Sequence, residues 1–255
     1  MSEKPNDAAA TDTVTAAMLA IGDELLSGRT KDRNIGHLAD MMTAAGIDLK
    51  EVRIVSDDHD AIVEAVRALS KRYTYLFTSG GIGPTHDDIT ADAIADAVGR
   101  ECTHDPAAMA LLADHYAGRG LEFTEARQRM ARMPIGAAHI GNPVSKAPGF
   151  IVDNIHVMAG VPSVFQAMLD NVMPTLKTGA KIHSLSVACP YGEGDIGGPL
   201  AAIQKAHSNV VIGSYPRYDG KRFSTEIVAR SRDLQAAQAA QDAIAAMIDA
   251  IVPND

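Results

Sequence analysis

A glycine-rich run near residue 80 is the segment of this 255-residue chain best suited to bind an anion. The run reads Ser79-Gly80-Gly81-Ile82-Gly83. Three glycines in five residues let the backbone turn sharply and approach a ligand closely. Their N–H groups can form an anion nest, and a helix that begins shortly afterwards favours negative charge at its N-terminus. We expect a phosphate or pyrophosphate here; the alternative is a tight turn in which Asp87 or Asp88 caps that helix.

Candidate catalytic side chains follow the glycine run, namely His86, Asp87 and Asp88. Carboxylates repel a phosphate unless a cation intervenes, and Mg²⁺ typically uses one or two carboxylates plus substrate phosphates. We expect Asp87 and Asp88, with Asp23 from an earlier loop, to position Mg²⁺, Mn²⁺ or Co²⁺. The alternative for each acid is a helix cap or solvated surface. His86 can donate to a phosphate oxygen or transfer a proton, and its alternative is an exposed loop histidine.

The segments around these residues alternate between strand and helix patterns. Short apolar runs over 14–21, 47–55 and 73–78 predict strands, and apolar residues recur at helical spacing between them. This order predicts a parallel sheet covered by helices, with ligands bound outside the carboxyl ends of the strands. We therefore expect the loops after the three strands to open onto one edge. These loops are Gly22-Asp23-Glu24, Ser56-Asp57-Asp58 and Gly80-Gly81.

The rest of the chain predicts further helices and strands and a second domain. We expect helices at 89–98, 106–116, 124–133 and from Gly160 to about 176, and short strands at 150–152 and 156–158. Beyond Thr178-Gly179-Ala180 the pattern becomes strand, helix, hairpin and a long Ala-rich helix. The expected division is a disordered tail at 1–13, an α/β domain at 14–176 and a small α+β domain at 177–255.

Composition excludes several classes of protein. A net charge of −9 counts against nucleic-acid binding, which needs a basic surface. Gly194-Asp195-Ile196-Gly197 is formally a GxxG loop, but it is acidic, so we expect the small domain to dimerise rather than bind RNA. The two cysteines predict reduced thiols and no zinc site. No secretory signal or membrane span is expected, which favours a cytoplasmic protein.

Several motifs in order give this chain a family resemblance. They are Gly22-Asp23-Glu24-Leu25-Leu26-x-Gly28, Gly80-Gly81-Ile82-Gly83-Pro84-Thr85-x-Asp87-Asp88-x-Thr90, Asn142-Pro143, Ala147-Pro148-Gly149-Phe150 and Gly160-Val161-Pro162. Over about residues 14–176 the chain resembles the N-terminal domain of CinA proteins. That domain is similar to MoaB/Mog molybdopterin-binding proteins and to a domain of eukaryotic FAD synthases. Residues 177–255 resemble the KH-type module that follows in CinA.

The resemblance implies a fold and a set of ligand-binding residues. The fold is a three-layer αβα domain with a mostly parallel sheet, followed by a small α+β KH-like domain. The ligand carries a phosphate or pyrophosphate on the glycine loop, with Asp88 and Thr90 at a pterin site. Asp57 corresponds to an acidic residue after the second strand, and Asp32 with Asn34 to a polar pair near the first helix. The further implied ligand-binding residues are Ser79, Gly80, Gly81, Ile82, Gly83, Thr85, Gly149 and Pro162.

The chain also departs from the family pattern. Ser79 replaces the usual Thr and keeps a hydroxyl group. Ser145 stands where the family favours Gly, Ala159 where it favours Pro, and Val164 where it favours an acid. The chain ends where CinA continues into a deamidase domain, so nicotinamide mononucleotide deamidation is not expected.

Two functions follow from this resemblance. The first is a metal-dependent pyrophosphatase that acts on ADP-ribose or a related dinucleotide, in which the metal neutralises developing charge and activates water. The second is a non-catalytic protein that binds molybdopterin and is linked to molybdenum cofactor biosynthesis. The same fold serves both, so the fold does not decide between them. A weaker third interpretation is an interaction protein with a vestigial site. We expect a homo-oligomer, either a dimer or a trimer.

Overall fold

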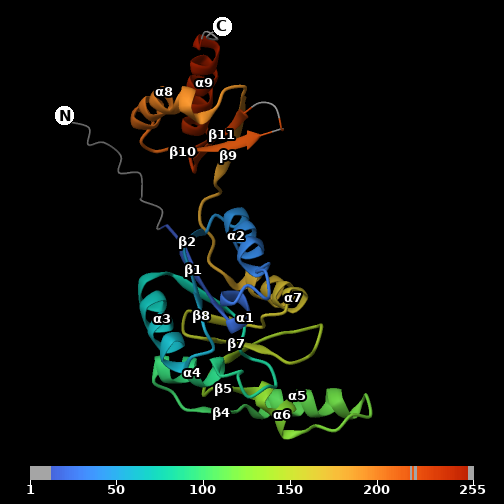
Figure 1. Ribbon diagram of the computed structural model, residues 1–255. Coiled ribbons are helices and arrows are strands. Elements are labelled where there is room, and N and C mark those ends of the chain that lie inside the picture. The colour runs from blue at the N-terminus through green and yellow to red at the C-terminus, as the bar shows by residue number, and fades with distance from the viewer. Residues whose placement is uncertain (1–12, 219, 221–222, 252–255) are drawn as a thin grey trace, which may run out of the picture. The chain divides into compact units, whose positions relative to one another are not determined.

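The computed structural model of the protein describes residues 13–218, 220 and 223–251 (Figure 1). Apart from Thr13, the tail expected at 1–13 lies outside these described residues. The chain divides into two compact units, Met1–Gly179 and Ala180–Asp255. Each unit has its own hydrophobic core.

The first unit is built on a six-stranded sheet with the order β2-β1-β3-β8-β7-β6. The pairs β1–β2, β1–β3 and β3–β8 are parallel, whereas β7–β8 and β6–β7 are antiparallel, which confirms a mostly parallel sheet. The strands are β1 (Thr15–Ile21), β2 (Asp48–Val55), β3 (Tyr75–Ser79), β6 (Ala138–Ile140), β7 (Gly149–Val152) and β8 (Ile155–Met158).

Helices cover both faces of this sheet, because the central strand β1 is apolar on both sides. Ala17 and Leu19 of β1 belong to one core cluster, which also includes residues of the helices α3 (His59–Arg72), α4 (Thr90–Val98) and α5 (Pro106–Ala117). Ala16 and Met18 belong to the other cluster, with the helices α2 (Asn34–Ala44) and α7 (Pro162–Val172). The three expected layers are therefore present.

Three segments differ from the expected elements. Residues 23–28 were expected as a loop, yet they contain the short helix α1 (Asp23–Leu26). The single helix expected at 124–133 is instead α6 (Glu125–Gln128), a 3₁₀ turn η1 (Arg129–Ala131) and the strand β5 (Arg132–Pro134), which pairs with β4 (Cys102–His104). The helix expected to reach 176 ends at Val172 and continues as the 3₁₀ turn η2 (Met173–Thr175), since Pro174 has no N–H for an α-helical bond.

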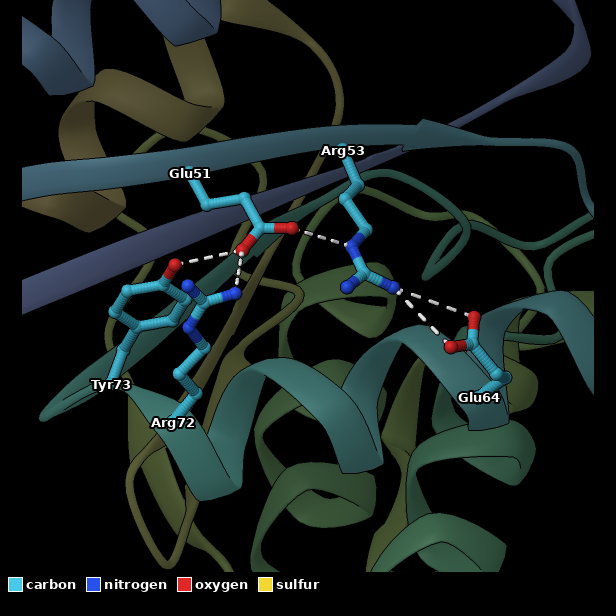
Figure 2. Close-up of polar contacts among 5 residues, drawn as sticks. All are labelled: Glu51, Arg53, Glu64, Arg72 and Tyr73. Atoms are coloured by element: carbon cyan, nitrogen blue, oxygen red, sulfur yellow. Dashed lines mark hydrogen bonds and ion pairs between the residues drawn. The ribbon is translucent and has the colours of Figure 1, made fainter.

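A polar network fastens the C-terminal end of α3 to the edge strand β2 (Figure 2). Glu51 accepts hydrogen bonds from the Arg53 Nε at 2.8 Å and the Tyr73 hydroxyl at 2.7 Å, and Arg72 Nη1 lies 3.4 Å away. Arg53 also contacts Glu64 on α3. The hydrogen bonds from Arg53 and Tyr73 lower the pKa of Glu51. These paired charges hold α3 against the exposed edge of the sheet, and each carboxylate in the network has a cationic partner.

The second unit has the element order strand, helix, two strands and helix. These are β9 (His183–Cys189), α8 (Glu193–Ala206), β10 (Val211–Tyr218), β11 (Phe223–Ser231) and α9 (Leu234–Ala250). The antiparallel sheet has the order β10-β11-β9, and its core contains Ile196 of α8, Ile227 of β11 and Ile244 of α9. The Gly194–Gly197 segment expected as a loop lies in the first turns of α8.

The two cysteines are far apart in the chain and form no disulfide. Cys102 and Cys189 are both free, and Cys189 is buried. Burial raises the pKa of the partly exposed Cys102 to about 12, which keeps its thiol protonated. Within the described part of the chain, no helix is both long enough and apolar enough to cross a membrane.

Candidate functional site

A cavity of about 560 Å³ lies at the carboxyl ends of the parallel strands. Loops after β1, β2, β3 and β8 all reach it, so the three expected loops do open onto one edge. The lining residues are Ile21, Gly22, Glu24, Thr30, Asp57, Gly80, Gly81, Ile82, Gly83, Asp87, Asp88, Met130, Asn142, Ser145, Ala147, Ala159, Gly160, Val161, Pro162, Val164 and Met168.

The first two glycines of the loop stand where no side chain fits. Gly80 has φ of 113°, and a Cβ there would lie 2.2 Å from the Ile21 carbonyl oxygen at the end of β1. Gly81 has φ of 66°, and a Cβ there would lie 2.1 Å from Thr90 Oγ1. Both backbones therefore need the left-handed region and close packing, which only glycine combines.

The loop presents unused backbone donors next to the cavity. The Gly80 N–H donates to the Met158 carbonyl at 3.1 Å, and the Gly81 carbonyl accepts from the Thr90 N–H at 3.0 Å. The N–H groups of Gly81, Ile82 and Gly83 donate to no described residue. The N-terminus of α7, which begins at Pro162, also lines the cavity and has no side-chain cap. Free N–H groups and a helix N-terminus both favour an anion.

Asp88 closes the glycine loop rather than capping α4. Its Oδ2 accepts hydrogen bonds from the Thr85 N–H at 2.7 Å and the Thr85 hydroxyl at 2.5 Å. The same oxygen would lie 2.6 Å from a Cβ at Gly83, which explains the third glycine. The N-cap of α4 is Ile89 without any side-chain cap, so the alternative in which Asp87 or Asp88 caps the helix is wrong. The cap of α3 is Asp58, which accepts from the Ala61 N–H.

Several expected ligand residues lie behind the loop and support it. Asn34 is buried, and its Nδ2 donates to Ser79 Oγ at 2.7 Å and to the Gly160 carbonyl at 2.8 Å. Thr90 is buried beneath Gly81. Asn34 Oδ1 and Thr90 Oγ1 are buried without a hydrogen-bond partner among the described residues. Ser79, Asn34 and Thr90 are not on the cavity wall.

The cavity wall is acidic. Glu24, Asp57, Asp87 and Asp88 line it, whereas no Lys, Arg or His does so among the described residues. Asp57 Oδ2 accepts from the Asp23 N–H at 2.9 Å. Burial raises the pKa of Asp57, and the nearby charges of Asp23, Glu24 and Asp87 raise it further. The carboxylates therefore leave negative charge uncompensated beside the anion-binding backbone.

The acids do not form a self-sufficient metal site. No group of three or more His, Cys, Asp or Glu side chains among the described residues is arranged to hold a metal ion. Asp57 and Asp87 fit a different arrangement, in which a divalent ion arrives with a phosphate and takes one or two carboxylates. Asp23 lies beside them in an adjoining hollow that Asp57 and Asp87 share. Its side chain does not line the main cavity.

Three further expected residues lie away from the cavity wall. His86 is 98% exposed and does not line the cavity, so the alternative of an exposed loop histidine describes its position. Asp32 Oδ1 accepts from the Ile35 N–H at 2.8 Å and thus holds the first turn of α2. Gly149 lies in β7, where a Cβ would meet the Val157 carbonyl at 2.3 Å. Its role is close strand packing.

The cavity also contains residues that the sequence did not single out. Met130 and Met168 contribute apolar side chains to the lining, and Thr30 contributes a polar one. They come from three separate segments, namely η1, α7 and the loop before α2, and none of the three residues belongs to one of the sequence motifs. Asn142 and Ser145 also line the cavity, and the sequence pointed to both. Asn142 belongs to the Asn142-Pro143 motif, and Ser145 occupies a position where the family favours Gly.

Comparison with known proteins places these features in a family. Residues 17–178 match the family described as "Probable molybdopterin binding domain". Residues 181–255 match "FAD synthase, middle domain". A protein of Pyrobaculum calidifontis is 33% identical over 241 residues, which cover 90% of this chain and 92% of that protein.

Two further relatives carry the name CinA. A CinA-like protein of Desulfosudis oleivorans is 36% identical over 179 residues, which cover 67% of this chain and 43% of that protein. The crystal structure of CinA from Thermoplasma acidophilum, described as having unknown function, superimposes with a TM-score of 0.60 at 30% identity. It covers 64% of this chain and 98% of that chain. The resemblance to CinA and the fold expected from it are confirmed.

Proposed function

Because the chain belongs to the family of probable molybdopterin binding domains over residues 17–178, we propose that it binds a phosphorylated pterin of the molybdopterin type in this cavity. The phosphate would accept hydrogen bonds from the N–H groups of the glycine loop, and the ring system would lie against the apolar lining residues. The proposal concerns binding, because a fold and a pocket do not by themselves give turnover.

The observation that carries the proposal is the set of free N–H groups at Gly81, Ile82 and Gly83 beside the cavity. Buried or half-buried N–H groups normally find a partner, so a run of free donors at a pocket supports an acceptor-rich ligand. The phosphate group of the proposed ligand offers such acceptor oxygens.

The apolar part of the cavity lining supports a flat organic group. Met130, Val164 and Met168 contribute apolar side chains to it, and Ala147 and Ala159 contribute small ones. Small-molecule sites commonly combine an apolar lining with a few placed polar groups. A cavity of about 560 Å³ lies within the range of roughly 300–1,000 Å³ found for such sites.

The test is to express the chain in a host that makes molybdopterin and to measure the pterin that copurifies. After release and oxidation, bound pterin is quantified by fluorescence. We expect near-stoichiometric pterin with the natural chain, little with Gly81→Ala and an unchanged amount with Gly36→Ala. Gly36 has open space around it, so it is a matched glycine control. A folded natural chain that carries no pterin would contradict the proposal.

A second candidate function is metal-dependent hydrolysis of a diphosphate such as ADP-ribose. The acidic wall favours it, because Asp57 and Asp87 could hold a divalent ion together with the diphosphate. Such an ion neutralises phosphate charge and lowers the pKa of bound water. Water would add across the phosphorus–oxygen bond and leave two monophosphates.

The assay is incubation with ADP-ribose and Mg²⁺, Mn²⁺ or Co²⁺, followed by detection of a monophosphate. Asp57→Asn and Asp87→Asn are the informative variants. The Asp88→Asn variant is less informative, because Asp88 also accepts two hydrogen bonds from Thr85 that close the glycine loop. Turnover that needs metal and is lost in both variants supports hydrolysis. Pterin retention without turnover supports binding alone.

A further inference from the structure

A second, smaller hollow adjoins the main cavity at the glycine loop. Residues 81–83 and Asp88 line both spaces, so the loop borders each of them. The main cavity has four acids and no basic side chain among its described lining residues. The smaller hollow differs, because the two arginines Arg129 and Arg132 line it. Positive charge therefore reaches the glycine loop from this hollow and not from the main cavity.

The two arginines have different partners. Arg132 forms an ion pair with Asp92 of α4, which compensates its charge. No ion pair joins Arg129 to a carboxylate among the described residues. Its Nη2 donates instead to the main-chain carbonyl of Asp88 at 3.1 Å. Arg129 thus brings a positive charge to the loop without a carboxylate to neutralise it.

The hydrogen bond from Arg129 holds the residue that closes the glycine loop. The Asp88 side chain accepts from the Thr85 N–H and hydroxyl, which closes the loop from within. The Asp88 carbonyl accepts from Arg129 in η1, which is 41 residues away in the sequence. Arg129 therefore ties the end of the loop to a separate segment of the fold.

The charge of Arg129 is also partly shielded from water. The side chain is half-buried, and its Nε atom is buried. Salt screens a partly buried charge much less than an exposed one. A guanidinium group does not lose its proton in proteins, so this charge does not depend on pH. A phosphate on the free N–H groups of the loop would therefore lie near a permanent positive charge.

We propose that Arg129 is a positioning residue for anion binding, which holds the glycine loop through the Asp88 carbonyl and supplies an unpaired positive charge beside it. The inference rests on the proposed function, since it assumes that the phosphate of the ligand binds this loop. Arg129 acts through the loop and not by direct contact, because it does not line the main cavity. It would favour a phosphorylated ligand over its uncharged counterpart.

The first test is calorimetric titration of the full chain with inorganic pyrophosphate in the presence of Mg²⁺. Arg129→Met keeps an apolar stem but removes the charge and the hydrogen bond, so we expect affinity about tenfold weaker. Arg129→Lys keeps a charge and a donor, so it should restore most of the affinity. Arg127→Met is the matched control and should bind pyrophosphate normally. Arg127 also donates to a main-chain carbonyl, that of Glu122, but it lines neither space.

The second test is amide hydrogen exchange of the full chain without ligand, followed by NMR. The Thr90 N–H reports on the loop, because it donates to the Gly81 carbonyl at 3.0 Å. The amide of Met18, which is buried in β1, reports on unfolding of the whole domain. In Arg129→Met we expect the exchange rate at Thr90 to rise by more than the rate at Met18.

The outcomes separate this inference from the proposed function. Weaker binding in Arg129→Met, restored by Arg129→Lys and absent from Arg127→Met, supports it when exchange at Thr90 also rises. Unchanged affinity in Arg129→Met would overturn it and leave phosphate binding to the N–H groups of the loop intact. A lysine variant as weak as the methionine variant would overturn the role of the charge. If the natural chain binds neither pyrophosphate nor pterin, the proposed function fails, and exchange at Thr90 alone decides whether Arg129 holds the loop.

Discussion

Asn34 donates a hydrogen bond to Ser79 Oγ at 2.7 Å and so joins the start of α2 to the end of β3. The same Nδ2 donates to the Gly160 carbonyl at 2.8 Å, at the loop before α7. Gly160 in turn approaches the glycine loop, because a Cβ there would lie 3.3 Å from Gly80 Cα. One buried amide therefore fixes the relative positions of the loops that frame the cavity.

Replacing Asn34 by Ala should loosen this frame. Ser79 Oγ and the Gly160 carbonyl would lose a buried donor, so we expect a loss of about 1–3 kcal/mol in the free energy of unfolding. Pyrophosphate affinity should fall as well, because the loops are no longer held together. Chemical denaturation and titration measure the two effects. Asn171→Ala is the control, since its exposed amide donates to the Gly141 and Ala167 carbonyls and should change stability by much less.

Alanine at Gly81 should damage both the fold and the site. A left-handed φ of 66° disfavours alanine, and the Cβ would overlap Thr90 Oγ1. We expect at least about 2 kcal/mol of destabilisation, measured by thermal and chemical unfolding. Gly36→Ala provides the contrast, because Gly36 lies inside α2 with open space around it. That change should stabilise by about 0.5–1 kcal/mol. Equal effects of the two changes would refute the packing argument.

The sheet and its order of helices could be predicted because the apolar patterns are local. Strand β1 is apolar from Ala16 to Ile21 and was predicted within one residue of its bounds, and α3 was predicted because its apolar residues recur at helical spacing. The strands β4, β5 and β6 escaped prediction because each has three residues. A run this short has no period, and only pairing across the chain decides that it is a strand.

The position of the site could be predicted, whereas the roles of its residues could be predicted only in part. The loops after three strands were expected on one edge from the alternation alone, and Gly22, Asp57 and Gly80 do line one cavity. The sequence does not show that Asn34 and Thr90 lie behind the loop. A polar residue next to a motif has the same sequence pattern whether its side chain faces the ligand or supports the loop from behind. Met168 escaped notice because an apolar helix residue predicts a core position.

The buried His156 should make the protein less stable in mild acid. It is 4% exposed and packs against the rings of Tyr75 and Phe77, and burial lowers its pKa from 6.5 to about 4. Between these two pH values His156 is protonated in the unfolded chain but neutral in the folded chain. Stability is therefore lost as the pH falls from about 6.5 towards 4. The difference between 6.5 and about 4 corresponds to about 3 kcal/mol. His156→Phe should flatten this part of a melting-temperature profile, whereas His86→Gln, at a 98% exposed side chain, should not.

Asp57 should have the opposite dependence on pH. Burial and the charges of Asp23, Glu24 and Asp87 raise its pKa, so the folded state binds the proton more tightly than the unfolded state does. Its contribution to stability is then greatest at low pH and is lost as the pH rises from the unfolded pKa through the raised folded value.

Asp57→Asn should therefore raise the melting temperature at pH 7, and the gain should shrink as the pH falls towards 3. Asparagine keeps an oxygen that can accept from the Asp23 N–H, so the loop contact survives. Asp170→Asn serves as the control, because Asp170 is exposed and its side chain makes no hydrogen bond or ion pair among the described residues. A divalent ion bound with pyrophosphate would favour the ionised Asp57. Mg²⁺ and pyrophosphate together should thus stabilise the natural chain more than the Asp57→Asn variant, and equal stabilisation would mean that Asp57 does not contact the ion.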